Sequence, residues 1–450
     1  MPQPARKPAQ EDPAQLPVTS RQSRVAVALR ALRHRNFRLF FAGQLISLIG
    51  TWMQTIAQSW LVYKLTGSSL LLGTVGFCSQ IPVFLLAPAG GIVADRSNRR
   101  KIVIATQTAS MILSFILAML TLTHHVRVWH VMFLASCLGV VNAFDIPARQ
   151  AFLIDMVGRE DLLNAIALNS SMFNGARIVG PAVAGVLIAW IGEGYCFLSN
   201  SISYIAVIAG LLLMHIDRPA KLKIEASPIE NMIEGFRFVK HTAPIRAILL
   251  LLGLVSIVGM PYAVLMPVFA DQILHGGPRA LGMLMGATGV GALIGALSLA
   301  ARTGVRGLGR LIAFAACSFG VSLILFSVSR IFWLSIILLI PAGFSMMVHM
   351  ASSNTMIQSM VPDQLRGRVM SVYSMMFMGM APFGAFFAGA VAHHIGAPLT
   401  VAIGGGVCII GGSIFAMILP SIRQEARELI LAQGMSAGFP AQEMTSREVS

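Results

Sequence analysis

Three ionisable side chains lie within long apolar stretches of the sequence, where a charge is costly. Asp145, Arg177 and His349 are each surrounded by apolar residues, and an ionisable group at membrane depth is a candidate for function by default. Burial favours a neutral carboxyl group and a nearby arginine favours the carboxylate, so a group under both influences can change protonation with conformation. Asp145 is therefore our first candidate for proton coupling. His349 is the second, because a lone histidine is more often a packing residue.

Two arginines are candidate partners for Asp145. Arg149 follows one helical turn later and could hold Asp145 in a static ion pair, whereas Arg177 could pair with it from another helix. Arg177 lies near the middle of its apolar stretch, where a lone cation is costly. We therefore expect Arg177 to face a cavity, either paired or binding an anionic substrate. The sequence leaves both interpretations of Asp145 open.

Further polar side chains could line the same cavity. Gln54 and Gln58 are one turn apart and share a helix face, Gln80 lies in the next apolar stretch, and Tyr262 lies between two prolines that could break a helix. Hydrogen bonding between helices is an equally good interpretation of the glutamines. The five cysteines lie in apolar stretches without metal-ligand spacing, so we expect no metal site, no disulfide and no cofactor.

The elements that must position these residues are membrane-spanning helices. Hydrophobic residues make up 56% of the 450 residues and charged residues 11%, and the mean hydropathy is +0.76. A soluble domain has about a quarter of its residues charged. A membrane helix needs about 20 mainly apolar residues, and twelve such stretches predict an all-α polytopic membrane protein: 37–64, 70–94, 101–123, 129–149, 164–191, 194–214, 245–270, 280–301, 310–328, 332–357, 369–395 and 398–419.

The basic residues indicate the orientation of these spans. The formal net charge is +15 at pH 7, and most of the 33 lysines and arginines fall in segments on the side of both termini. The positive-inside rule then places both termini in the cytoplasm and the chain in the inner, or plasma, membrane. Because topology explains the basic excess, we expect no nucleic-acid partner.

The chain repeats itself at a spacing of 204 residues, which lays Gly180 on Gly384 and Gly185 on Gly389. Matching glycines indicate that the same close helix contacts are made twice. The repeat predicts an N-terminal tail (1–36), a six-helix half (37–214), a cytoplasmic linker with an amphipathic helix (215–243), a second, pseudo-symmetric half (244–419) and a C-terminal tail (420–450). Two halves of this kind are typical of a rocking transporter whose site lies between them.

The loop between the second and third stretches carries the most specific motif. Its residues are Gly91, Asp95, Arg96, Arg99 and Arg100. The positive-inside rule explains the arginines. Asp95, however, stands at the negative end of a helix and needs a cationic partner or the start of another helix.

This loop resembles the signature loop of the major facilitator superfamily, with Asn98 in place of a usual glycine. The resemblance implies the major facilitator fold, in which the aspartate acts as a conformational latch against the start of the eleventh span. The latch partner here would be Arg366, Gly367 and Arg368.

A second motif lies in the fifth span, where Gly180, Pro181 and Gly185 permit a kink and close packing. Ordinary small-residue packing explains them on physical grounds, while the motif also resembles one of exporter branches. Residues 142–152, 234–237 and 361–369 are similar to the branch that contains enterobactin exporters and macrolide-efflux-like proteins. This resemblance covers residues 33–420 and implies export.

Together, the repeat, the latch-like loop and the buried acid predict a secondary active transporter. We expect proton-coupled export of a small hydrophobic or amphiphilic molecule, of siderophore or drug type, by alternating access. An uptake symporter or facilitator on the same fold is the alternative. A membrane enzyme or a non-transporting receptor is the third possibility, which we do not favour. The absence of His-Glu-x-x-His and Gly-x-Ser-x-Gly motifs argues against catalysis, and the absence of Gly-x-x-x-x-Gly-Lys-Ser/Thr argues against direct use of ATP. The expected partners are the substrate and membrane lipid, the expected energy source is the proton gradient, and the expected state is a monomer.

Overall fold

The computed structural model describes residues 29–215, 228–302 and 304–436, and these residues form helices joined by short turns. Twelve of the described segments are long and apolar enough to cross a membrane, and each coincides with one of the predicted stretches. The predicted all-α fold with twelve spans is therefore confirmed. The tails 1–28 and 437–450 and the linker segment 216–227 lie outside the described residues.

The first half begins with a short 3-10 helix, η1 (Arg30–Arg33). Its six spanning helices are α2 (Arg35–Thr66), α3 (Ser69–Arg96), α4 (Arg99–Leu122), α5 (Val128–Val157), α6 (Leu162–Ile191) and α7 (Glu193–Leu212). The Asn98 side chain accepts a hydrogen bond from the Lys101 N–H at 3.1 Å and so caps α4. The residue that replaces the usual glycine of the loop motif is thus a helix cap.

A linker helix, α8 (Pro228–His241), leads into the second half. Two prolines, which lack a backbone N–H, break the seventh span into α9 (Ala243–Leu254), η2 (Val255–Gly259), η3 (Met260–Ala263), α10 (Met266–Val268) and η4 (Phe269–Ile273). The next three spans are α11 (Gly277–Ala300), α12 (Leu308–Val328) and α13 (Phe332–Met360). The last two consist of α14 (Asp363–Ser374), η5 (Met375–Gly379), α15 (Ala381–Ile395) and α16 (Ala397–Ser436).

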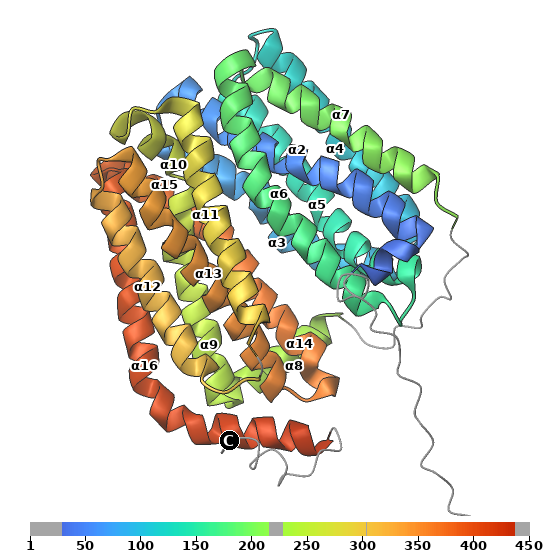
Figure 1. The fold of residues 1–450 in the computed structure, drawn as a ribbon, viewed down its shortest axis with the longest axis vertical. Helices are drawn as coiled ribbons and strands as arrows, with labels where there is room; N and C mark the ends of the chain where they lie inside the picture. Colours follow the sequence, from blue (N-terminus) through green and yellow to red (C-terminus); the bar gives the residue numbers. More distant parts are fainter. Residues whose placement is uncertain (1–28, 216–227, 303, 437–450) are drawn as a thin grey trace, which may run out of the picture.

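The helices form two bundles that lie side by side, α2–α7 and α9–α16 (Figure 1). The bundles meet at the top of the view in Figure 1 and diverge towards the bottom, where the described C-terminus lies. We call the end of the molecule that holds η1 and the last turns of α16 the terminal end, and the opposite end the closed end.

Two glycine pairs hold the halves together near the closed end. α3 packs against α15, where a Cβ on Gly73 would lie 2.9 Å from the Cα of Gly389. α6 packs against α11, where a Cβ on Gly185 would lie 3.1 Å from the Cα of Gly282. Helix backbones approach this closely in membranes only where small residues meet. The glycines of the internal repeat therefore form equivalent contacts on the two sides of the interface.

The last helix is longer than its predicted span. α16 continues past residue 419, and Figure 1 shows that it bends and runs beneath the second half. This helix contains Pro420, and a proline inside a helix favours a bend because it removes a backbone hydrogen bond. Beyond Pro420, Ile422 and Ala426 are buried, and Glu425 accepts a hydrogen bond from the Ala243 N–H at 3.2 Å. The first part of the predicted C-terminal tail is thus a helix anchored to the second half.

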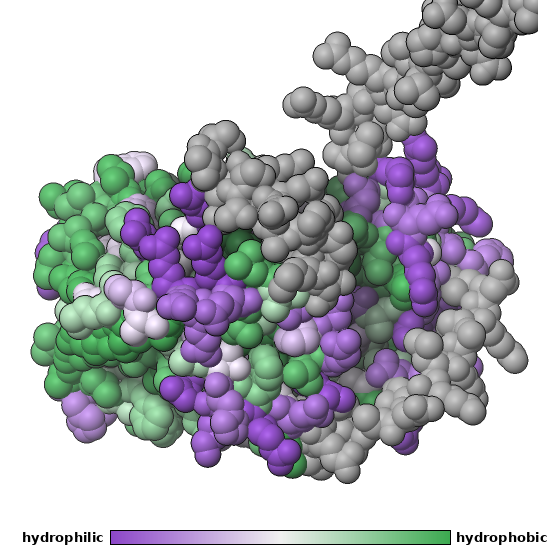
Figure 2. Space-filling view, turned by 90° about the horizontal axis from the view of Figure 1, so that it is seen from below, coloured by the Kyte–Doolittle hydropathy of each residue, from purple (hydrophilic) through white to green (hydrophobic). Residues whose placement is uncertain are grey.

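Polar and apolar surfaces are separated along the molecule. Figure 2 shows hydrophilic residues gathered on the face at the terminal end, with hydrophobic residues at its edge. Large apolar side chains are exposed on the flanks of the bundle, among them Phe314 and Trp333, each 65% exposed. Exposed apolar surface of this extent marks contact with a partner or with lipid.

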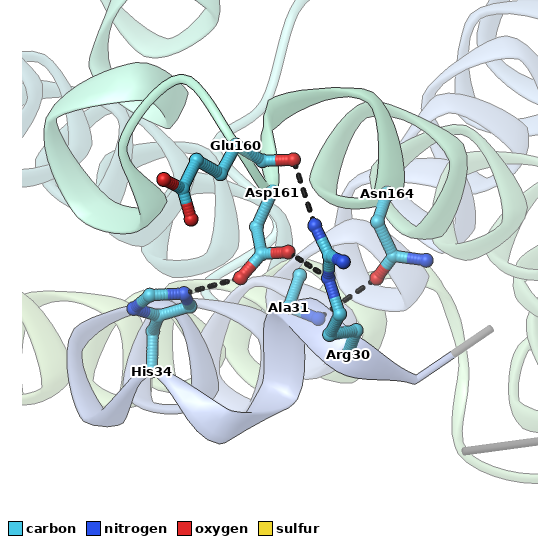
Figure 3. Close-up of polar contacts among 6 residues, drawn as sticks. All are labelled: Arg30, Ala31, His34, Glu160, Asp161 and Asn164. Carbon is cyan, nitrogen blue, oxygen red and sulfur yellow. Dashed lines mark hydrogen bonds and ion pairs between the residues drawn. The ribbon is translucent and has the colours of Figure 1, made fainter. Parts of the chain in front are cut away.

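At the terminal end, η1 docks on the loop that precedes α6 (Figure 3). The Asp161 carboxylate accepts a hydrogen bond from Arg30 and lies 2.7 Å from the Nε2 atom of His34. Arg30 also donates to the Glu160 carbonyl oxygen at 2.9 Å. The hydrogen bond with His34 lowers the pKa of Asp161 more than burial raises it, and Arg30 lowers it further.

Candidate functional site

Arg177 lies on α6 where this helix crosses α11 of the other half. A Cβ on Gly289 of α11 would lie 3.3 Å from the Arg177 carbonyl oxygen, so the two halves touch at this level. The half-buried guanidinium lies over the Trp52 ring, 5.8 Å from its centroid, and Phe173 meets Trp52 edge-to-face at 5.5 Å. Within the described part of the chain, Arg177 has no ion pair. A cation without an acidic partner among the described residues thus lies on the helix that contacts the second half.

Asp145 is held inside the first half by three neighbours. Its side chain is 4% exposed and lies 3.4 Å from the Nε atom of Arg149. Thr106 and Gln107 of α4 donate hydrogen bonds to its Oδ1 atom at 2.7 and 2.9 Å. In this conformation the partner of Asp145 is therefore Arg149, one helical turn along α5, and not Arg177. The role of Asp145 in proton coupling stays a prediction.

Two candidate residues of the second half are buried within that half. The Nδ1 atom of His349 lies 3.4 Å from the Ile312 carbonyl oxygen, and its Nε2 atom has no hydrogen-bond partner among the described residues. The Tyr262 ring is buried and meets Phe319 of α12 edge-to-face at 6.0 Å. Both environments are those of packing residues. A proton-carrying role for His349 and a substrate-binding role for Tyr262 stay predictions.

The glutamines divide between two environments. The Oε1 atom of Gln54 accepts hydrogen bonds from Ser114 of α4 and Asn200 of α7, both at 2.6 Å. Gln54 thus joins three helices of the first half, as the hydrogen-bonding interpretation predicts. Gln58 is half-buried and Gln80 is exposed, and a role of these two side chains in lining a substrate cavity stays a prediction.

The residues of the loop motif bond within the first half. Arg99 donates to Asp155 of α5 at 3.1 Å, and one of its nitrogens lies 3.9 Å from Asp95. Arg100 donates to the Leu211 carbonyl oxygen at 2.8 Å and so satisfies the end of α7. Of the other two members of the motif, Gly91 is half-buried and Arg96 is exposed. The basic residues therefore also have a structural role at helix ends.

The predicted latch partner is engaged with other groups. Arg366 lies 2.6 Å from the carboxylate of Asp363 in the same helix, and Arg368 forms an ion pair with Glu234 of the linker helix α8. Gly367 lies between them with open space where a Cβ would stand. Contact between Asp95 and this region stays a prediction for a conformation in which the halves meet at the terminal end.

The motif of the fifth span mediates close packing on both of its sides. A Cβ on Gly180 would lie 2.4 Å from the Cβ of Trp52. On the other face, a Cβ on Gly282 would lie 2.6 Å from the Pro181 carbonyl oxygen and 2.8 Å from the Cα of Gly185. The small-residue interpretation therefore describes the geometry of all three motif residues.

One polar contact between the halves has no counterpart in the sequence analysis. The Tyr63 hydroxyl group donates a hydrogen bond to Asp271 at 3.1 Å and joins α2 to η4 at the closed end. The two residues are 208 positions apart, so no local pattern links them. The available signal was an acidic residue at the end of the seventh span.

Comparisons with known proteins agree with this architecture. The model of the transmembrane secretion effector family matches residues 26–446. A staphyloferrin A transporter of Staphylococcus aureus is 26% identical over 82% of this chain and 92% of its own. An enterobactin exporter of Shigella boydii is 23% identical over 87% of this chain and 93% of its own.

The fold is also found among solved structures. The nucleoside transporter NupG superposes with a TM-score of 0.67 over 86% of this chain and 99% of its own, at 15% identity. These findings confirm the expected superfamily and the branch that contains enterobactin exporters. The chain therefore belongs to the transmembrane secretion effector family of the major facilitator superfamily, and it is a membrane transporter rather than an enzyme.

Proposed function

We propose that this protein exports an anionic amphiphilic molecule, of siderophore or drug type, across the inner membrane by alternating access. The relatives described as a staphyloferrin A transporter and an enterobactin exporter support this class of cargo. The distribution of lysine and arginine supports a cytoplasmic terminal end. With that orientation, halves that diverge at the terminal end represent the state in which an exporter loads its cargo.

The observation that carries the choice of cargo is Arg177. It lies at membrane depth on the helix that contacts the second half, and its guanidinium lies against Trp52 with no ion pair among the described residues. A carboxylate or phosphate of the cargo would satisfy it with charge-assisted hydrogen bonds. The neighbouring rings of Trp52 and Phe173 would pack against the apolar body of the same molecule.

Asp145 is the proposed proton carrier. In the present conformation its carboxylate lies against Arg149 and accepts hydrogen bonds from Thr106 and Gln107. We propose that a shift of α4 against α5 during the transport cycle removes the hydrogen bonds from Thr106 and Gln107, so that the carboxylate then binds a proton. Export of cargo and entry of protons would be linked in this way.

Transport direction tests the proposal. Inverted membrane vesicles with an acidic interior are given labelled carboxylate siderophores, catecholate siderophores and macrolides, with protein-free vesicles as the control. We expect accumulation of an anionic compound inside the vesicles, and we expect a proton ionophore to abolish it. Accumulation in right-side-out vesicles alone would instead identify an uptake transporter.

A further inference from the structure

A groove on the surface of the second half has no part in the proposed transport path. It lies between α12 and α16 and encloses about 610 Å³. Figure 1 shows these two helices on the side of the second half that faces away from the first half. The apolar lining includes Ala313, Phe314, Ala416 and Leu419. Because Phe314 is 65% exposed, the groove opens on the side of the molecule that faces lipid.

The two helices remain in contact beside the groove, towards the terminal end, where a Cβ on Gly412 would lie 3.1 Å from the Ala313 carbonyl oxygen. Further from that end they are in close contact, and a Cβ on Gly320 would lie 2.4 Å from the Gly405 carbonyl oxygen. Near the terminal end, α16 contains Pro420, and Figure 1 shows that the helix bends before its end. The small side chains of Ala313 and Ala416 then leave the space unfilled. The groove therefore lies on the outer surface of a closely packed helix pair and is lined in part by small residues.

Two arginines lie at the terminal end of this groove. Arg310 is in the first turn of α12, and Arg423 follows Pro420 in α16. Both are exposed, and neither has a hydrogen bond or an ion pair among the described residues. The contact between Glu425 and the Ala243 N–H holds the segment that carries Arg423 in place. The positive end of the α12 dipole adds to the same field.

We propose that this groove binds an anionic glycerophospholipid from the leaflet at the terminal end. The phosphate group would lie between Arg310 and Arg423, and an acyl chain would pack along Phe314 and Ala416. Charge complementarity argues for the anionic headgroup, because basic pockets between spanning helices suit such lipids. The apolar lining argues for a whole lipid rather than a free phosphate ion, since most of the groove has no polar partner to offer.

The headgroup contact is tested on the purified full-length protein in neutral detergent. Phosphatidylglycerol or phosphatidylcholine is titrated in, and native mass spectrometry counts the bound lipids. We expect phosphatidylglycerol to bind more tightly. Arg310→Gln and Arg423→Gln should each weaken its binding about five-fold, whereas Arg279→Gln, which removes an equal charge at the closed end, should not. Equal affinity for the two lipids, or an equal effect of all three substitutions, would overturn the proposal.

The acyl-chain contact needs a substitution that leaves the charge unchanged. Ala416→Phe fills the groove, while Ala105→Phe adds the same bulk to an exposed position of α4. We expect loss of bound phosphatidylglycerol for Ala416→Phe alone, and no displacement of the lipid by excess inorganic phosphate. Unchanged binding by Ala416→Phe, or displacement by phosphate, would rule out a lipid in the groove. Arg423→Lys keeps the charge and should keep most of the binding, so it checks that a loss in Arg423→Gln does not reflect misfolding.

Discussion

At Arg177, positive charge, membrane depth and the lack of an acidic partner coincide in one side chain. Arg177→Gln should weaken the binding of an anionic cargo about ten- to a hundredfold, because a hydrogen bond to a charged group contributes roughly 1.5–3 kcal/mol. Arg177→Lys keeps the charge but loses the planar guanidinium group, so its affinity for the cargo should lie between those of the wild type and Arg177→Gln. Equilibrium binding to the purified protein measures both. An equal loss of affinity for neutral and anionic compounds would show that Arg177 only supports the fold.

Gln54 is a structural residue in this arrangement, since its one acceptor oxygen serves Ser114 and Asn200. Gln54→Leu should lower the free energy of unfolding by about 1 kcal/mol, the scale of hydrogen bonds between membrane helices, and should leave cargo affinity unchanged. Thermal unfolding and binding measure the two effects. Gln58→Leu, one turn away on the same helix, is the control for stability and should unfold like the wild type. A change in cargo affinity without a change in stability for Gln54→Leu would place this residue in the binding site instead.

At the scale of the helices, the glycine contacts at the closed end determine how closely the halves approach. Gly282→Ala puts a methyl group 2.6 Å from the Pro181 carbonyl oxygen, so α6 and α11 must separate. Gly286→Ala, one turn later, meets no atom closer than 3.9 Å. Distances between spin labels across the closed end should therefore lengthen in Gly282→Ala and stay at the wild-type value in Gly286→Ala. Equal distances in both variants would exclude this role of the glycine pair.

The docking of η1 should depend on pH through Asp161. The pKa of this carboxyl group is lowered by His34 and Arg30, so it lies below the ordinary value of about 3.9. The contribution of Asp161 to docking is then fully present at pH values above this ordinary pKa, and it is lost as the pH falls through the pKa of the docked state. Hydrogen exchange of residues 30–34 should rise accordingly in acid. Asp161→Asn should show fast exchange at every pH. Glu160→Gln should behave as the wild type, because Glu160 contacts Arg30 only through its backbone carbonyl oxygen.

The sequence predicts the spans and the breaks within them because these depend on local composition. Prolines at 261 and 267 indicate the irregular seventh span, and the glycine repeat indicates close contacts made twice. The partners of polar residues depend on how distant helices are placed. The same glutamine pattern covers Gln54, which hydrogen-bonds within the first half, and Gln80, which is exposed. The contact between Tyr63 and Asp271 is likewise a consequence of assembly, so no single segment indicates it.

At the scale of the whole molecule, the two halves are joined at one end and diverge at the other. Glycine pairs and the hydrogen bond between Tyr63 and Asp271 close one end, while the predicted latch residues at the terminal end bond to their own surroundings. Alternating access would exchange these two sets of contacts. Asp95 would then contact Arg366 and Arg368 when the terminal end closes. The ion pair between Arg368 and Glu234 would break in this step.

Proton-coupled export is tested most directly by substrate-dependent proton release. Inverted vesicles that contain the protein are acidified inside, and a pH-sensitive dye reports the loss of protons when an exported compound is added outside. We expect release from vesicles with the wild-type protein and none from vesicles with Asp145→Asn, although both proteins bind the compound and unfold at similar temperatures. Proton release by Asp145→Asn equal to that of the wild type would contradict the role of Asp145, and export without any proton release would contradict proton coupling itself.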